Sequence, residues 1–517
     1  MVVAAAVVFG CGGRGGDGSR WVPEDAGIAL VAPSAETLRD QLTKTLGGVE
    51  GLSGVLDLIE ARAGLDLRTR DGLLATGVDP AASLSLFQRE GTVGLALGVT
   101  HRSRFHARVA RQVSRTGQAT VQALDGETGP IAVAKAHAED APDTIAWSLA
   151  WGTGPDAVGL VVWSPGPEAA ETWRALAAAR RSDDTLMTRA TAALAGRAGA
   201  FVTATGPPTI PASWGLGPAK VALLPVISGL TAWEGTWIVE PTRTALTLDG
   251  RWTTEGQLAA DWFQPAGAPA PLAVALPKSQ TITARARLNL ARLRSIPAFL
   301  RKRILPERVP GPLGGALPPV MDLLGLLNGD VSVSILGLDA SATVDHALQG
   351  DALDDALQLV HAAVLVGVTD PAAARAVVAA VTKHLASSGW FAAQLEAAGW
   401  SGVALRSEKS PAIWSIIQRD DVVAVISGPG EVARFVRVAE GTALSLEASA
   451  DGPVAKGAAS SPEVALGLSA GFRRITRELA DKGFPPYFLQ MVNDLRAISG
   501  TLRFRPDGAT VDLEVRL

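Results

Sequence analysis

The 517-residue sequence contains only one cysteine and one tyrosine. A single cysteine excludes an internal disulfide framework and the zinc sites built from cysteine pairs. No segment has 18 or more uninterrupted apolar residues, so no membrane-spanning helix is expected. The net charge is −4, which provides no basic field for nucleic acid, and no nucleic-acid partner is predicted.

What is present is a composition typical of globular proteins. Hydrophobic residues make up 47% of the chain and charged residues 19%. These values separate the chain from disordered sequences, which have few apolar residues and a high net charge. A chain of this length is too long for one hydrophobic core, so two or more domains are expected.

The single cysteine, Cys11, lies in a distinctive local context. It follows the apolar residues 2–9 and Gly10, and it precedes the polar, glycine-rich segment 12–20. This order resembles the lipobox of bacterial lipoproteins, although no Lys or Arg precedes the apolar run. The resemblance implies that signal peptidase cuts before Cys11 and that diacylglycerol is attached to its thiol. Residues 1–20 are then a signal, lipobox and flexible tether, with ordered structure beginning near Trp21. The alternative is a frayed terminus with an incidental cysteine.

The lipoprotein resemblance also implies a location. An exported, lipid-anchored protein is held at the cell envelope by acyl chains without a spanning helix. In lipoproteins, a residue other than Asp after the cysteine usually accompanies sorting to the outer membrane, and Gly12 stands at that position. The expected location is therefore the periplasmic face of the outer membrane. The expected partners are the membrane, reached through the lipid anchor, and an envelope protein or lipid.

Three short segments recur in the same order along the chain. GVT at 98–100 recurs at 367–369, IAWSL at 145–149 resembles AIWSI at 412–416, and GT at 235–236 recurs at 500–501. These matches pair Gly98 with Gly367, Trp147 with Trp414 and Gly235 with Gly500. The offset drifts only from 269 to 265 residues, which predicts a duplicated unit of about 250 residues.

The duplication defines the expected domains. We expect a first unit at 21–263, a Pro/Ala linker at 264–271 and a second unit at 272–517. Alternating strands and hairpins predict the α+β class, with two duplicated units of antiparallel sheet and helices packed on one face. In the second unit, Asp370 is predicted to cap a helix that has Pro371 in its first turn.

The segment Trp21-Val22-Pro23-Glu24-Asp25 and the repeated strand–helix units together resemble exported bacterial proteins of an uncharacterised family. The resemblance covers most of the chain and its motifs are structural. It implies no activity and no catalytic residues.

One catalytic pattern occurs, Gly-Leu-Ser-Ala-Gly at 467–471. A strand before it and a helix after it would suit the nucleophile elbow of a serine hydrolase using Ser469. In that fold the histidine follows the serine, whereas the last histidine here is His384. A small-residue turn between strand and helix is therefore favoured, and no catalytic residue is assigned.

Metal and cofactor sites are not predicted either. No two of the six histidines have the i,i+4 spacing that places two imidazoles on one helix face. The segment 428–431 resembles a phosphate loop only in its glycines, and it lacks the Lys-Ser/Thr pair that such loops use. A turn is the favoured interpretation of this segment.

Two further features leave alternatives open. The basic amphipathic segment 292–308 could rest on anionic lipid or an acidic partner, or be a solvated face. Ten of the 13 tryptophans precede residue 264, which predicts either a different core packing or an aromatic binding surface in the first unit. The candidate binding residues are Trp151, Trp163, Trp173, Trp233 and Trp237.

The sequence is thus best interpreted as a non-enzymatic cell-envelope lipoprotein that acts as a scaffold or partner-binding module. The alternative is a carrier or sensor that holds an apolar ligand, such as a lipid, between the two units. A hydrolase using Ser469 is the least favoured interpretation.

Overall fold

The structure is a computed structural model of the full chain. The residues that it describes are 16–46, 69–89, 92–115, 119–124, 131–136, 143–149, 157–165, 175–176, 185–205, 229–254, 257, 261–263, 272–278, 282–290, 325–338, 360–407, 410–428, 430–446, 464–471, 497–505 and 507–516. Cys11, the predicted linker 264–271 and the basic segment beyond residue 290 lie outside these ranges.

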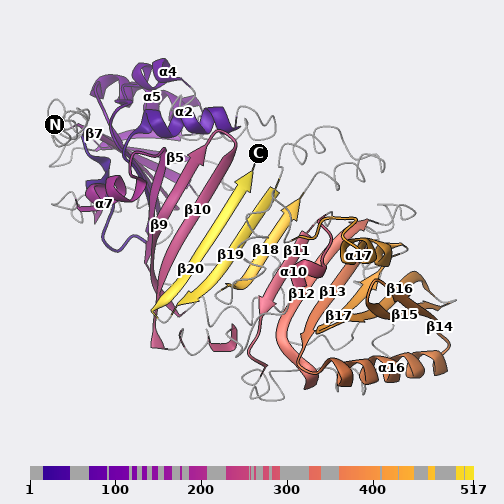
Figure 1. Ribbon diagram of the computed structural model, residues 1–517. Helices are drawn as coiled ribbons and strands as arrows, with labels where there is room; N and C mark the ends of the chain where they lie inside the picture. The colour runs from indigo at the N-terminus through magenta and orange to yellow at the C-terminus, as the bar shows by residue number, and fades with distance from the viewer. Residues whose placement is uncertain are drawn as a thin grey trace, which may run out of the picture. The chain divides into compact units, whose positions relative to one another are not determined.

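The chain divides into two compact units (Figure 1). Unit 1 comprises Met1–Pro208 and Thr231–Gly250, and unit 2 comprises Thr209–Leu230 and Arg251–Leu517. The described strands of unit 1 are β1 (Ile28–Ala32), β2 (Leu84–Arg89), β3 (Thr92–Gly98), β4 (Ala119–Leu124), β5 (Ile131–Ala136), β6 (Asp143–Leu149), β7 (Val158–Pro165), β8 (Gly199–Thr205), β9 (Leu230–Glu240) and β10 (Arg243–Trp252). Its described helices are η1 (Gly18–Trp21), α2 (Ala35–Leu46), α4 (Arg70–Ala75), α5 (Arg102–Arg115) and α7 (Thr185–Leu194).

Unit 2 is built from the remaining described elements. Its described strands are β11 (Ile282–Arg287), β12 (Leu327–Leu338), β13 (Val360–Val368), β14 (Phe391–Ala397), β15 (Trp400–Ser407), β16 (Ser410–Arg419), β17 (Val422–Ser427), β18 (Val464–Gly471), β19 (Ala497–Arg505) and β20 (Gly508–Arg516). Its described helices are η4 (Asp261–Phe263), α10 (Leu272–Ala275), α16 (Pro371–Ser387) and α17 (Glu431–Ala439).

The two units repeat the same order of strands. In unit 1 the order is β10-β9-β8-β1-β2-β3-β7-β6-β5-β4. In unit 2 it is β20-β19-β18-β11-β12-β13-β17-β16-β15-β14. Each strand of unit 2 thus takes the place of the strand numbered ten lower in unit 1. The fold is α+β with antiparallel sheets, as predicted.

The register of the strands tests the sequence alignment. One row of cross-strand neighbours in unit 1 runs from β9 to β4 through Gly235, Val202, Leu30, Leu86, Leu95, Val161, Trp147, Ala132 and Ala123. The equivalent row in unit 2 runs from β19 to β14 through Gly500, Leu468, Ala284, Val333, Val364, Val425, Ile416, Val403 and Gln394.

Two of the three aligned pairs occupy equivalent positions in these rows. Gly235 and Gly500 start the two rows, and Gly98 and Gly367 each lie three residues beyond the row in β3 and β13. The third pair is wrong by two residues, because Trp147 shares its place with Ile416 rather than Trp414. A shift of two residues keeps a side chain on the same face of a strand, so the alternating pattern could not reveal the error.

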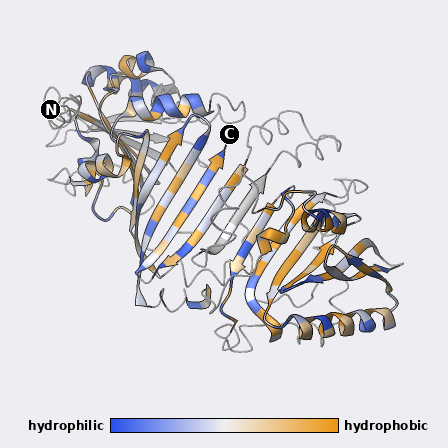
Figure 2. Cartoon of the chain, in the orientation of Figure 1, coloured by the Kyte–Doolittle hydropathy of each residue, from blue (hydrophilic) through white to orange (hydrophobic). Residues whose placement is uncertain are grey.

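Described helices lie on both faces of the strands of each unit, whereas the sequence predicts helices on one face. In unit 2, alternate strand residues form two apolar clusters, one containing α16 and the other α10 and α17. In unit 1, one cluster includes α7 and the opposite one includes α2. Figure 2 shows the orange, apolar strands β13 and β17 inside unit 2 and the mixed colouring of α16. Because helices cover both faces, some strands have apolar side chains on both sides and do not alternate apolar with polar residues.

The segment before Trp21 differs from the flexible tether that was predicted. Asp17 caps η1 by accepting a hydrogen bond from the Ser19 amide, and the Gly18 amide donates to Ser83 Oγ at 2.8 Å. Ser19 is only 1% exposed. The tether prediction is therefore wrong for residues 16–20, because an Asp in a glycine-rich segment caps a helical turn that docks on the sheet.

The repeated row provides a matched pair of variants. A Cβ at Gly235 would collide with the carbonyl oxygen of Thr247 in β10, whereas one at Gly500 would lie 3.6 Å from Leu513 Cδ1 and 3.7 Å from the Asp512 carbonyl oxygen. We expect Gly235→Ala to lower the free energy of unfolding by about 1–3 kcal/mol, since the strands must separate. Gly500→Ala should stay within about 0.5 kcal/mol. Urea unfolding measures both, and equal losses would contradict the prediction.

Candidate functional site

The candidate site is a groove in unit 2 beneath α16. The helix begins where the sequence predicts, because the Asp370 side chain accepts hydrogen bonds from the amides of Ala372 and Ala373 and Pro371 occupies its first turn. One side of α16 is buried against β15, β16 and β17, through Ala374, Val378, Val381 and Leu385. This apolar stripe fixes α16 across the end of the sheet of unit 2.

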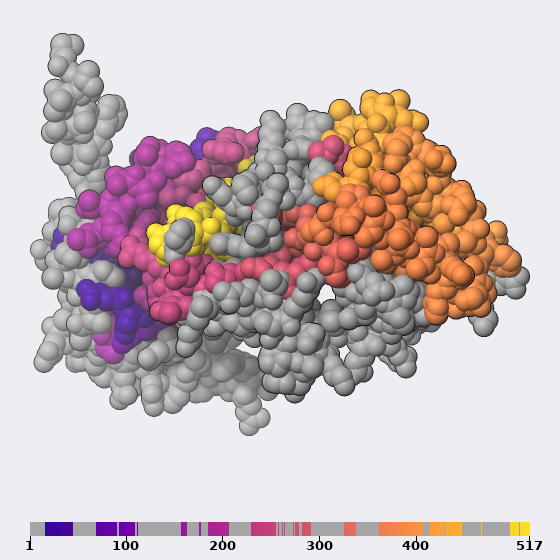
Figure 3. All heavy atoms as spheres, turned by 60° about the horizontal axis from the view of Figure 1, so that its bottom comes forward, coloured from indigo at the N-terminus to yellow at the C-terminus, as the bar shows by residue number. Residues whose placement is uncertain are grey.

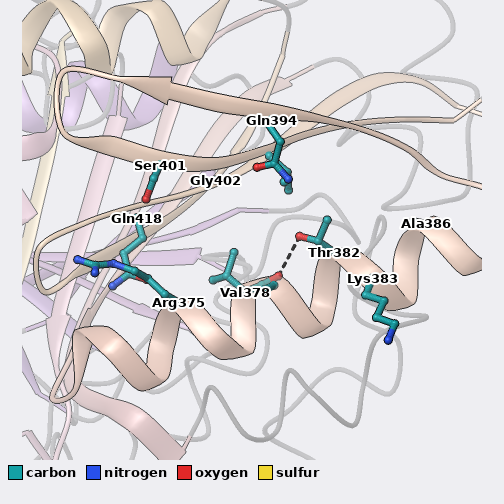
Figure 4. Close-up of a pocket in the computed structure, with 11 residues that line it drawn as sticks. Arg375, Val378, Thr382, Lys383, Ala386, Gln394, Ser401, Gly402 and Gln418 are labelled. Atoms are coloured by element: carbon teal, nitrogen blue, oxygen red, sulfur yellow. Dashed lines mark hydrogen bonds between the residues drawn. The ribbon is translucent and has the colours of Figure 1, made fainter.

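The groove has a volume of about 350 Å³ and lies between α16 and the strands β14, β15 and β16 (Figure 4). Such a volume lies at the small end of ligand pockets and suits one or two side chains of a partner. Its wall on the helix side is formed by Arg375, Val378, Ala379, Thr382, Lys383 and Ala386. Its wall on the sheet side is formed by Gln394, Ser401, Gly402, Val403 and Gln418.

Hydrogen bonds hold the polar part of the groove in place. Gln418 is 2% exposed, and its Nε2 donates to the carbonyl oxygens of Pro371 at 2.8 Å and Asp420 at 3.1 Å. Thr382 Oγ1 donates to the Val378 carbonyl oxygen within α16. In Figure 4, Gln394 projects from its strand toward Thr382. The amide of Gln418 thus ties β16 to the start of α16, and Gln394 remains available at the open side.

Two cations flank the groove. Arg375 and Lys383 are exposed, and neither forms an ion pair with any residue that the structure describes. In Figure 4 the ammonium group of Lys383 extends away from the strands. Long Lys and Arg side chains reorient at little cost, so both cations can turn toward an anionic group in the groove.

The strand beside the groove, β14, is an open edge of the sheet. Within the described part of the chain it pairs only with β15, and six of its seven residues are exposed. Phe391 is 62% exposed, and Glu396 is the only charged residue of the strand. Natural proteins usually protect such edges with Lys, Pro, bulges or a covering element. Figure 3 shows this region, in orange, at the molecular surface.

Ser469 does not lie in a nucleophile elbow. It is inside β18, where its backbone is paired with Thr283 of β11 and with Ser499 of β19, and the strand continues to Gly471. An elbow needs a sharp turn directly after the strand, with the serine at its tip. Both the hydrolase interpretation and the favoured turn are therefore wrong for this segment.

The candidate tryptophans are only partly described. Trp233 is 7% exposed, which agrees with the core-packing alternative and not with a binding surface. Trp237 is half-buried against the cluster beneath α2, and its Nε1 donates to Thr244 Oγ1 at 2.5 Å. The side chains of Trp151, Trp163 and Trp173 lie outside the described residues. The two described rings therefore have structural roles.

A further polar group, which no motif in the sequence predicts, lies at the start of α17. His361 Nδ1 is 3.1 Å from Glu431 Oε1, and the other oxygen of Glu431 accepts a hydrogen bond from Arg434 at 2.5 Å. Gly428 has a φ of +108° and lies against the imidazole ring, where a Cβ would overlap it. Gly428, the first residue of the segment predicted as a turn, thus makes room for the imidazole.

No described helix is long and apolar enough to cross a membrane. No group of three or more His, Cys, Asp or Glu side chains in the described ranges could hold a metal ion.

Comparison with known proteins gives little further information. No family model and no curated protein matches the sequence. Crystal form III of the treponemal protein TP0453 aligns with 47% of this chain and 85% of its own length, at 10% identity and a TM-score of 0.27. Crystal form I aligns with 46% and 80%, at 11% identity and a TM-score of 0.28. At these TM-scores the similarity supports no inference about this chain.

Proposed function

We propose that the chain is a lipid-anchored protein of the bacterial cell envelope that acts by binding a partner rather than by catalysis. The anchor is Cys11, in its lipobox-like context, and the location is the periplasmic face of the outer membrane. The observation that supports partner binding is the strand β14, which pairs on only one side within the described residues and begins with the exposed Phe391. An exposed edge offers unpaired N–H and C=O groups to which another chain can add a strand.

A position-specific experiment tests this proposal. In one strain, a photo-crosslinking residue replaces Phe391 in a protein that is otherwise natural. In the control strain, the same residue replaces Leu444. Leu444 is similarly exposed, at 56% against 62%, and belongs to the same unit. We expect a discrete crosslinked adduct in the envelope fraction from position 391 and none from position 444. Adducts of equal yield at both positions, or none at 391, would contradict a partner at β14.

A further inference from the structure

We propose that the partner at β14 is an extended peptide segment whose acidic side chains enter the groove beneath α16. The inference rests on the proposed function, because it names the chemistry of the partner at the same strand. Three observations support it, namely the edge of β14 that no described strand pairs with, the groove on one side of that edge, and the cations along α16.

The strand geometry directs the partner's side chains into the groove. Ala392 and Gln394 pair with Leu405 and Val403, so they share the face of the sheet that packs against α16. A peptide residue opposite Gln394 would lie on that same face, with its Cβ about 4.5–5.5 Å from that of Gln394. Alternate side chains of an added strand therefore point toward α16, where the groove can receive them.

The charges of α16 indicate which side chains the partner should place in the groove. From Pro371 to Ser387, α16 contains Arg375 and Lys383 and no carboxylate. The equivalent helix α5 contains five arginines between Arg102 and Arg115 and again no carboxylate. The chain as a whole has a net charge of −4, so both copies of this helix are locally basic in an acidic protein. Complementary charge favours Asp or Glu at the groove-facing positions of the partner.

The register of the charges restricts the partner further. Glu396 pairs with Ser401, which places it on the groove side of β14, two residues beyond Gln394. An acid directly opposite Glu396 would be repelled, since like charges opposite each other destabilise a strand pair. The acid is therefore expected opposite Ala392 or Gln394. An anionic membrane would satisfy the cations, but it cannot make main-chain hydrogen bonds with β14.

Synthetic peptides test the proposal with the full chain carrying Cys11→Ala. The probes are fluorescent ten-residue peptides that alternate Val with Glu, their Val–Lys counterpart, and the Val–Glu peptide with alternate amides N-methylated. Fluorescence anisotropy measures affinity, and hydrogen exchange measures protection of residues 391–397. We expect the Val–Glu peptide to bind at least about tenfold more tightly than the other two and to protect β14.

Two charge-reversal variants locate the binding, a double variant in α16 and a single control in α17. The double variant Arg375→Glu/Lys383→Glu should weaken Val–Glu binding at least about tenfold. Arg437→Glu makes the same kind of change on the exposed face of α17 and should alter the affinity less than about twofold. Circular dichroism checks that both variants remain folded. An equal loss in the Arg437 variant, or equal binding of the Val–Lys or N-methylated peptide, would overturn the proposal.

The remaining outcomes separate this inference from the proposed function. If no peptide binds while position 391 still crosslinks in cells, the acidic-peptide chemistry is wrong and the partner-binding role stands. If neither result is positive, both fail. If phosphatidylglycerol vesicles bind through Arg375 and Lys383 while no peptide does, the basic helix contacts a membrane and the peptide proposal is overturned.

Discussion

Replacing Cys11 by alanine is expected to move the protein completely from the membrane fraction to the soluble fraction. Each buried CH₂ of an acyl chain contributes about 0.8 kcal/mol to membrane binding, so two or three chains hold a protein firmly. The same variant should lose labelling by a palmitate analogue in growing cells, which can be measured in the gel band of the protein.

A neighbouring substitution controls for effects on export. Gly12→Ala keeps the cysteine and a small residue after it, so labelling and membrane recovery should match those of the natural protein. Equal labelling of the natural and Cys11→Ala forms would show that the thiol carries no lipid. Recovery of both forms in the soluble fraction would show that Cys11 does not anchor the chain.

The repeated strand order could be predicted from the sequence because the same residue type, glycine, occurs at equivalent places in both units. Gly98 and Gly235 recur in register with Gly367 and Gly500. The tryptophan match was less reliable because it rested on one aromatic residue in an alternating strand. An alternating pattern defines which face a residue occupies, but not which of two positions on that face it takes.

The course of β18 could not be predicted because its partners are distant in sequence. The Gly-Leu-Ser-Ala-Gly segment has the small residues of a turn, and its own propensities favour one. β11 and β19 pair with it along both sides, and these tertiary hydrogen bonds outweigh the local preference. A single-sequence analysis has no access to that pairing.

The start of α16 was predictable and its groove was not. Asp370 and Pro371 form a local cap, which depends only on neighbouring residues. The groove depends on how β14, β15 and β16 meet the helix, and the open edge depends on which strands do not pair with β14. The basic character of α5 and α16 was the one signal in the sequence that could have indicated this site.

The two units differ in what they bury at equivalent positions. Thr283, Arg285, Ser334 and Gly467 of unit 2 correspond in register to four residues of unit 1, namely Ala29, Val31, Phe87 and Phe201. The unit 1 residues belong to an apolar core, and each is at most 4% exposed. In unit 2, Arg285 is 7% exposed and Arg287 is 3% exposed. The fold therefore does not require polar residues here, and the buried guanidinium groups of unit 2 depend on nearby carboxylates.

Asp330 is the carboxylate that joins these two arginines. It is fully buried, and its Oδ1 accepts a hydrogen bond from Arg287 Nε at 2.9 Å and lies 3.6 Å from Arg285. Asp330→Ala removes this negative charge from beside two buried positive charges. Breaking a buried ion pair by removing one partner costs about 3–5 kcal/mol, so we expect unit 2 to lose that much of its free energy of unfolding.

The test needs a readout specific to unit 2, because a two-unit chain need not unfold in one step. Hydrogen exchange of the β11 and β12 amides during urea unfolding provides one. Ser334→Ala is the control on the same face, since it removes only the 2.9 Å hydrogen bond with Thr283 and should cost about 1 kcal/mol. Asp330→Asn keeps the shape of the side chain without its charge, and it should fall between the two. If Asp330→Ala lowers the free energy of unfolding no more than Ser334→Ala does, then other groups neutralise both arginines.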